Sequence, residues 1–268
     1  MMAKKRLFAV LLLALSCFSL KAQVASSKAM DSVLKEAFKK KPDTLSVKAF
    51  SELQRYYFNR GQYDSALFYN RISLPVAEKA GTKMQLARIY YNAGLIYTNL
   101  TVYDSAIFYL NHAEKQALAI PDSNLLANVL NANALLSNYQ SDYRGAVEFL
   151  TRAAAMIQSS NSVELRNWLP QLYGNIGHNL IAAKQFRKGL DYEKRALQFS
   201  NFPDETRFRM MIHLDIAEAY IKLEDPDQSK PHLDSARIIG ATLNNTVLQT
   251  LQKNTEGVYY AKMKDYAG

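Results

Sequence analysis

The chain has 268 residues, of which 49% are hydrophobic and 21% are charged, and its formal net charge is +9. This composition excludes an intrinsically disordered chain, because such chains have too few apolar side chains to bury a core. Glycine and proline are few, at 10 and 7 residues, and they lie mostly between apolar runs, which indicates long helices with short connections.

The first 22 residues have the pattern of a secretory signal peptide. Basic residues at 4–6 are followed by an apolar stretch at 7–20 and by a small residue, Ala22. The apolar stretch is shorter than the roughly 20 residues that span a bilayer. We therefore expect residues 1–22 to be removed and the protein to be exported, either to the periplasm or to a membrane surface that faces it.

Removal of this segment changes the charge and the cysteine content. It takes away four basic residues and no acid, which leaves a net charge of +5. A basic excess this small, spread along the chain, does not indicate a nucleic-acid partner. Cys17 is the only cysteine, so the mature chain would have no disulfide and no thiolate ligand. An uncleaved anchor and a lipoprotein with its lipid on Cys17 remain as alternatives.

Residues 23–45 are expected to form a capping helix. Met30, Val33, Leu34 and Phe38 lie on one face of a helix that ends near Pro42. Such a helix would cover the first unit of the fold that follows. The alternative is a basic helix on a membrane surface, which would use the lysines at 35 and 39–41.

From residue 46 onward one segment recurs. The sequences GQYDSALFYN at 61–70 and TVYDSAIFYL at 101–110 lie forty residues apart. Five copies align on a small residue, with spacings of 40, 40, 43 and 40: Ala66, Ala106, Ala146, Gly189 and Ser229. A second small residue follows seven positions later in each copy. A fixed period of 20–50 residues indicates stacked units and not one globule.

The apolar spacing within each copy is helical. Ile89, Ala93 and Tyr97 recur at four-residue steps before a polar corner, and a second helical pattern follows that corner. Each copy therefore predicts a first helix (helix A), a tight turn and a second helix (helix B). Small residues such as Gly94 and Ala106 would let the two antiparallel helices approach closely.

The order of small residues and tyrosines around the turn resembles the tetratricopeptide repeat over roughly residues 47–268. The clearest copy is IYYNAGLIYTNLTVYDSAIFYLNHAEKQA at 89–117. The usual period is about 34, so a period of about 40 implies helices extended by a turn. The resemblance implies an all-α fold, a right-handed α-solenoid of antiparallel helix pairs over residues 46–268. It would hold five repeats and an incomplete sixth, because residues 256–268 match helix A and the turn.

Prolines mark departures from the repeat pattern. Pro75 falls inside helix B of the first copy, where it is expected to kink or shorten the helix. Pro226 and Pro231 make the fifth copy the least regular.

The resemblance also implies a non-catalytic scaffold that holds a protein or peptide partner in a concave groove lined by helix A. A side-chain amide carries a donor and an acceptor, so it can hold an extended peptide backbone without reading its sequence. The predicted peptide-binding residues are mostly such amides: Arg55, Asn59, Arg88, Asn92, Asn99, Asn131, Asn138 and Asn175. The competing interpretation is that asparagine is merely tolerated on an exposed helix face.

A second function is compatible with the same pattern. Exported repeat segments of this kind resemble the sensory ectodomains of membrane histidine kinases and of helix-turn-helix transcriptional regulators. A chain truncated within its sixth repeat would then continue into a membrane attachment and an output domain.

No catalytic, cofactor-binding or metal-binding motif is found in the sequence. A glycine-rich phosphate loop, a Gly-x-Ser-x-Gly turn and a His-x-x-x-His spacing are all missing. His178 and His213 lie on helix A of consecutive copies and could face each other. If the protein were an enzyme, changing one of His178, His213 or Asp215 should abolish its activity. We expect a non-enzyme that uses no cofactor.

Overall fold

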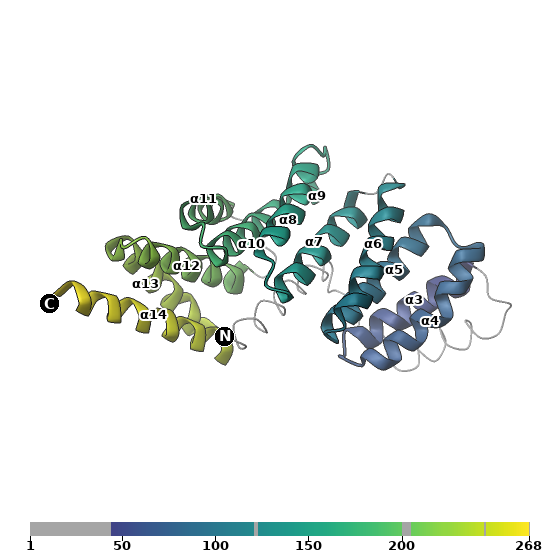
Figure 1. Cartoon of the computed structure of the whole chain (residues 1–268), viewed down its shortest axis with the longest axis horizontal. Coiled ribbons are helices and arrows are strands. Elements are labelled where there is room, and N and C mark those ends of the chain that lie inside the picture. Colours follow the sequence, from purple (N-terminus) through teal and green to yellow (C-terminus); the bar gives the residue numbers. More distant parts are fainter. Residues whose placement is uncertain (1–43, 121–122, 200–204, 244, 268) are drawn as a thin grey trace. The chain divides into compact units, whose positions relative to one another are not determined.

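The structure is a computed structural model that describes residues 44–120, 123–199, 205–243 and 245–267. The predicted signal peptide and nearly all of the predicted capping helix lie outside these residues. The described elements are all helices, and they contain no strand (Figure 1). No helix within the described ranges is long and apolar enough to cross a membrane.

The helices follow one another as the repeat predicts, with helix A and helix B alternating. They are α3 (Thr44–Phe58), α4 (Tyr63–Ala80), α5 (Lys83–Asn99), α6 (Tyr103–Leu118), α7 (Ser123–Tyr139), α8 (Tyr143–Gln158), α9 (Val163–Arg166), α10 (Leu169–Ala182), α11 (Phe186–Leu197), α12 (Glu205–Lys222), α13 (Pro226–Thr242) and α14 (Thr246–Ala267). The predicted all-α fold of helix pairs is therefore confirmed.

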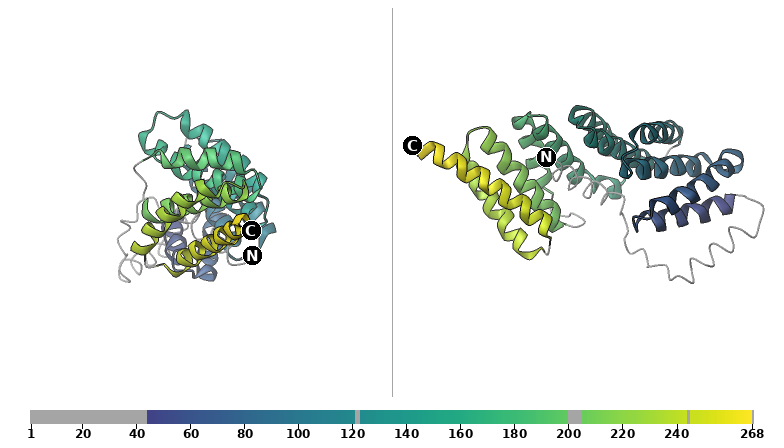
Figure 2. Two further views of the ribbon diagram at one scale, coloured as in Figure 1. Left: turned by 90° about the vertical axis from the view of Figure 1, so that its left-hand side faces the viewer. Right: turned by 60° about the horizontal axis from the view of Figure 1, so that its bottom comes forward.

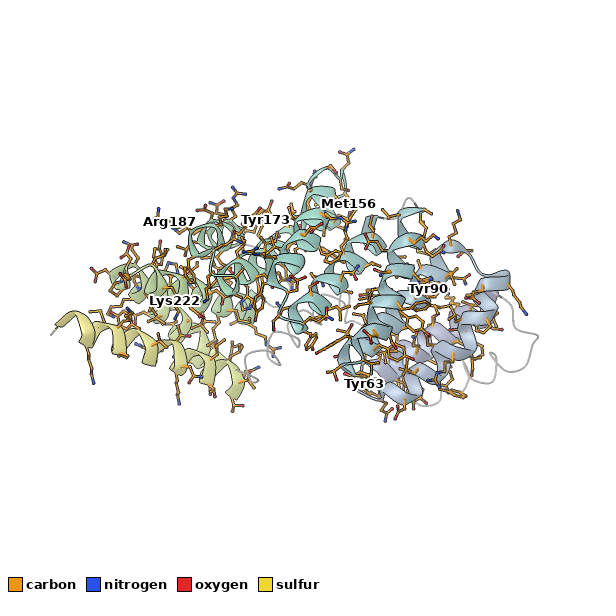
Figure 3. The ribbon with its side chains drawn as sticks, in the orientation of Figure 1. Tyr63, Tyr90, Met156, Tyr173, Arg187 and Lys222 are labelled. Atoms are coloured by element: carbon orange, nitrogen blue, oxygen red, sulfur yellow. The ribbon has the colours of Figure 1, made fainter. Side chains whose placement is uncertain are left out.

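The chain divides into two compact units between Leu136 and Ser137, inside α7. In the N-terminal unit, α3 packs on α4 and α5 packs on α6. Tyr90 of α5, which is labelled in Figure 3, has its ring centroid 6.2 Å from that of Tyr109 of α6. In the C-terminal unit α10 packs on α11, α12 packs on α13, and α14 packs against α12 and α13 (Figure 2).

The small residues lie where the two helices of a repeat meet. The aligned small residue is buried in all five copies: Ala66, Ala106, Ala146, Gly189 and Ser229. The small residue seven positions later is 0% exposed in every copy: Ser73, Ala113, Ala153, Ala196 and Ala236. A Cβ added to Gly94 would lie 2.5 Å from Cγ of Leu110. The predicted phase of the repeat is confirmed, since only small side chains fit at these contacts.

Every corner between helix A and helix B has the same backbone geometry. One residue of each corner has a left-handed φ of 62–70°, always five positions before the aligned small residue: Gly61, Thr101, Ser141, Lys184 and Glu224. The following N–H donates to the carbonyl five residues earlier, as Val102 N does to Tyr97 O at 3.0 Å. This is the Schellman arrangement that ends many helices. It terminates each helix A and reverses the chain.

Two segments differ from the expected repeat. The short helix α9 and the buried Trp168 lie between α8 and α10, and they account for the longer spacing of 43. Helix α4 continues through the exposed Pro75 to Ala80, so the expected shortening is wrong. The proline removes one backbone hydrogen bond, but buried Ser73 and Ala77 on either side keep the helix packed.

The last helix also extends further than the repeat pattern predicts. Helix α14 lies where helix A of a sixth repeat would lie, with Tyr259 buried. It remains helical to Ala267, through the residues where the pattern predicts a turn.

Candidate functional site

The eight residues predicted to bind a peptide differ widely in exposure. Arg55, Asn59 and Arg88 are exposed, and Asn92 and Asn99 are half-buried. The remaining three are buried, with 8%, 6% and 4% of their surface exposed: Asn131, Asn138 and Asn175. The first six lie in the N-terminal unit and the last two in the C-terminal unit. Their binding role stays a prediction.

Some of these asparagines already hold the protein together. Nδ2 of Asn92 on α5 donates to Oε1 of Gln54 on α3 at 3.0 Å. Nδ2 of Asn138 donates to Oδ1 of Asn179 on α10 at 2.7 Å. Both contacts join helix A of one repeat to helix A of the next. Nδ2 of Asn99 donates to the carbonyl of Leu95 in its own helix at 2.8 Å.

Other buried amides on helix A are incompletely paired within the described part of the chain. Nε2 of Gln54 and Oδ1 of Asn131, both in the N-terminal unit, have no hydrogen-bond partner there. Nδ2 of Asn175, in the C-terminal unit, also has none. A buried polar atom without a partner costs about 1–3 kcal/mol. Each of these atoms therefore makes an unfavourable contribution to the stability of the fold.

A separate polar cluster lies where α10, α11 and α12 of the C-terminal unit meet. Nδ1 of His178 lies 2.8 Å from Oδ2 of Asp215, within hydrogen-bonding distance. Glu193 of α11 is 0% exposed. Its carboxyl group lies over Gly177 of α10, where an added Cβ would come within 2.8 Å of Oε1. Neither oxygen of Glu193 has a hydrogen-bond partner among the described residues.

Burial controls the protonation of Glu193. Burial raises its pKa well above the ordinary value of 4.5, and the nearby carboxylate of Asp215 raises that pKa further. A buried carboxyl group that no cation neutralises favours its neutral form. The protonated form of Glu193 is therefore favoured over a wider pH range than in an exposed glutamate.

A further contact joins α12 to α13. Nδ1 of His213 lies 3.0 Å from Nδ1 of His232, so one imidazole donates and the other accepts. Burial, and then the nearby His232 and Arg209, lower the pKa of His213 to about 4. Burial, followed by the charge of Lys194, lowers the pKa of His232. Both rings are therefore mainly neutral at pH 7.

The structure gives a hydrogen-bonding partner to each of the two histidines that were expected to be able to face each other. His178 contacts Asp215, whereas His213 contacts His232. Among the residues that the structure describes, no group of three or more His, Cys, Asp or Glu side chains could hold a metal ion.

Sequence reasoning missed Glu193, although the repeat contains a signal for it. Four positions after the aligned small residue, three other copies carry a buried leucine: Leu110, Leu150 and Leu233. Glu193 occupies this position in the fourth copy. A charged residue at a leucine position of the repeat marks a departure from simple packing.

Solved structures share this arrangement of helices although their sequences have diverged. No family model matches the chain, and no curated protein matches it in sequence. The apo form of the quorum sensor NprR from B. thuringiensis matches over 90% of this chain and 67% of its own, with a TM-score of 0.71 and 16% identity. YrrB, described as a TPR protein with an unusual peptide-binding site, matches over 84% of this chain and 100% of its own, with a TM-score of 0.56 and 16% identity. The chain has the tetratricopeptide-repeat (TPR) fold.

Proteins with this TPR fold differ in what they do. NprR in complex with its cognate peptide NprX is similar over 96% of this chain and 73% of its own, with a TM-score of 0.56 and 17% identity. Aspartyl phosphate phosphatase F from Bacillus subtilis shares the fold at 17% identity and a TM-score of 0.61, over 81% of this chain and 64% of its own. The chain spans 39% of the chain that it matches in the Cut9–Hcn1 assembly. At these identities the likeness shows the fold alone.

Proposed function

We propose that this TPR-fold chain is a non-catalytic scaffold that binds a protein or peptide partner along its helix-A faces. The observation that carries the proposal is the set of incompletely paired buried amides: Gln54, Asn131 and Asn175. An extended peptide offers one N–H and one C=O per residue, so within either unit it can supply the kind of partner that these amides lack. The peptide complex of NprR and the description of YrrB support a role of this kind.

The exposed residues of the predicted site add side-chain contacts. Arg55 lies in the last turn of α3, Asn59 directly follows this helix, and Arg88 lies on α5 of the same unit. Their exposure allows contact with a partner without rearrangement of the core. Asn92, Asn99 and Asn138 hold backbone or neighbouring helices, so we assign them a supporting role in shaping the helix-A faces.

The amides can be tested by replacing each with leucine, which has a similar size and no polar atom. We expect Asn131→Leu and Asn175→Leu each to weaken binding of a peptide selected from a random phage-displayed library by about tenfold or more, since about 1.4 kcal/mol corresponds to a factor of ten. Thermal stability should stay equal or rise, because an unpaired buried polar atom is removed.

Asn111→Leu on α6 is the matched control, because this asparagine is exposed on a helix B. It should leave peptide affinity unchanged. Full affinity in both Asn131→Leu and Asn175→Leu would contradict the proposal. So would a selection that yields no peptide able to bind the folded chain.

Export is the second part of the proposal, and it depends on the basic and apolar pattern of residues 1–22. Mass spectrometry of the mature protein from the cells that make it should find Gln23 as the first residue. If mass spectrometry instead finds a lipid on Cys17, the exported protein is the membrane-anchored form. A protein that keeps residues 1–22 and stays in the cytosolic fraction would contradict export.

A further inference from the structure

Glu193 has no evident structural reason to be a carboxylic acid. In the second repeat the same position is Leu110, which is 0% exposed and packs over Gly94. Glu193 lies over Gly177, the glycine at the corresponding position of the fourth repeat. Leucine would fill this place without a cost of desolvation, whereas a buried carboxyl group without a partner is unfavourable. The fold alone therefore does not account for Glu193.

The cluster around Glu193 also has more acid than base. The titratable groups that face one another here are Glu193 from α11, Asp215 from α12 and His178 from α10. In the described part of the chain, no lysine or arginine pairs with either carboxyl group. Lys194 is next to Glu193 in sequence, but its Nζ lies 5.3 Å from the centroid of the Tyr220 ring. Two carboxyl groups near enough for the charge of Asp215 to raise the pKa of Glu193, with one imidazole, provide more acceptors than donors.

We infer that the junction of α10, α11 and α12 binds a cationic side chain of the partner, a primary ammonium or a guanidinium group. The inference rests on the proposed function, because it names the chemistry of the partner. The side chains of Asp215 and His178 are 14% and 27% exposed, so a cation can reach Asp215 from solvent. Glu193 is fully buried over Gly177 and carries the oxygens that lack donors.

Binding of the cation is coupled to loss of a proton. The proton on Glu193 leaves to solvent as the cation arrives, and the carboxylates of Glu193 and Asp215 then share one positive charge. One proton is released for each cation bound, while the ligand keeps its own protons. Affinity should therefore rise with pH, by up to about tenfold per pH unit over the range in which Glu193 is protonated in the free protein.

The experiment uses two small probes that do not require an extended peptide-binding surface. They are Nα-acetyl-lysine methylamide and its neutral counterpart, Nα-acetyl-norleucine methylamide. Binding to the full mature chain is followed at pH 6, 7 and 8 by NMR of isoleucine methyl groups, which include Ile176 of α10 and Ile216 of α12. We expect saturable shifts with the lysine probe only, and tighter binding at higher pH.

Three variants locate the site. Asp215→Asn should abolish binding of the lysine probe. Glu193→Gln, which is neutral and of equal size, should bind the probe weakly and with no dependence on pH. Asp234→Asn on α13 is the control, because this exposed acid pairs with Lys230 and Arg237 elsewhere in the same unit. It should bind the probe as the unchanged protein does.

Other results would overturn the inference. Equal shifts with the norleucine probe would show an apolar or adventitious contact. Unchanged pH dependence in Glu193→Gln would show that Glu193 is only a neutral packing residue, and this variant decides the matter even if Asp215→Asn fails to fold. Selected peptides that bind while the lysine probe does not would remove this inference and leave the proposed function. Binding of the lysine probe without any peptide binding would remove the proposed peptide-binding function and leave the cation site.

Discussion

Replacement of Ala106 by phenylalanine is expected to destabilise the N-terminal unit strongly. Ala106 is 0% exposed and packs in a cluster with Leu95, Leu110 and Leu136. A phenyl ring has no space between the two helices, and overpacking of a core costs about 1–3 kcal/mol or more. For a unit of this size each kcal/mol lowers the Tm by about 4–8 °C. Thermal unfolding of the full chain, with hydrogen exchange of α5 and α6, would measure the effect.

The adjacent residue provides a matched control. Ile107 is 39% exposed, so Ile107→Phe adds a similar ring to the outer side of the same helix. This variant should unfold at nearly the temperature of the unchanged protein. Equal Tm values for Ala106→Phe and the unchanged protein would show that the helices do not meet at this alanine.

Replacement of Glu193 by glutamine is expected to stabilise the C-terminal unit at neutral and alkaline pH. The unfolded chain releases the Glu193 proton near pH 4.5, whereas burial raises the pKa in the folded state well above that value. The folded state thus holds an extra proton as pH rises, so its stability falls with a slope that approaches about 1.4 kcal/mol per pH unit. Glutamine has nearly the same size and is neutral over this whole pH range, so it has no such proton to lose.

The gap between Glu193→Gln and the unchanged protein should therefore widen as the pH rises above 5, in urea unfolding followed by helical circular dichroism. Glu148→Gln is the control, since Glu148 is exposed on α8 of the same unit. Parallel curves for Glu193→Gln and the unchanged protein would mean that Glu193 is ionised in the folded state.

His213 affects the dependence of stability on pH at acidic pH. Its pKa falls from 6.5 to about 4 on folding, so the unfolded state binds more protons between these values. Its contribution to stability is complete above pH 6.5 and is lost as the pH falls toward about 4. Stability of the unchanged protein should therefore decline on both sides of a maximum.

The repeat phase could be predicted from sequence because close packing places the same demand on every copy. Ala106 and its four counterparts lie where the two helices of a repeat touch, so only a few small residue types fit at that position. The corners could not be predicted in the same way. Gly61 signals a left-handed residue, but Thr101, Ser141, Lys184 and Glu224 do not. Their conformation follows from the hydrogen bonds that end each helix A.

The candidate site was harder to predict than the fold. Asn92 and Gln54 are 38 residues apart, and Asn138 and Asn179 are 41 apart, so both pairs are close to one period. The period shows which helices are neighbours, but a difference of two or three residues decides which amides meet. Asn138 is buried and Asn59 is exposed. The sequence alone could not distinguish these two positions, because the difference depends on how the helices pack in space.

The uniform corners also make this protein convenient for spectroscopy. Thr101 and Lys184 are exposed, and the hydrogen bonds that shape their corners come from the backbone, so these two side chains can be replaced. Cys17, the only cysteine, lies in the predicted signal peptide. In a chain without the predicted signal peptide, a pair of introduced thiols at these two corners, one in each unit, would be the only sites for attaching dyes. Energy transfer between the dyes would then measure whether the distance between the two corners changes when a partner binds.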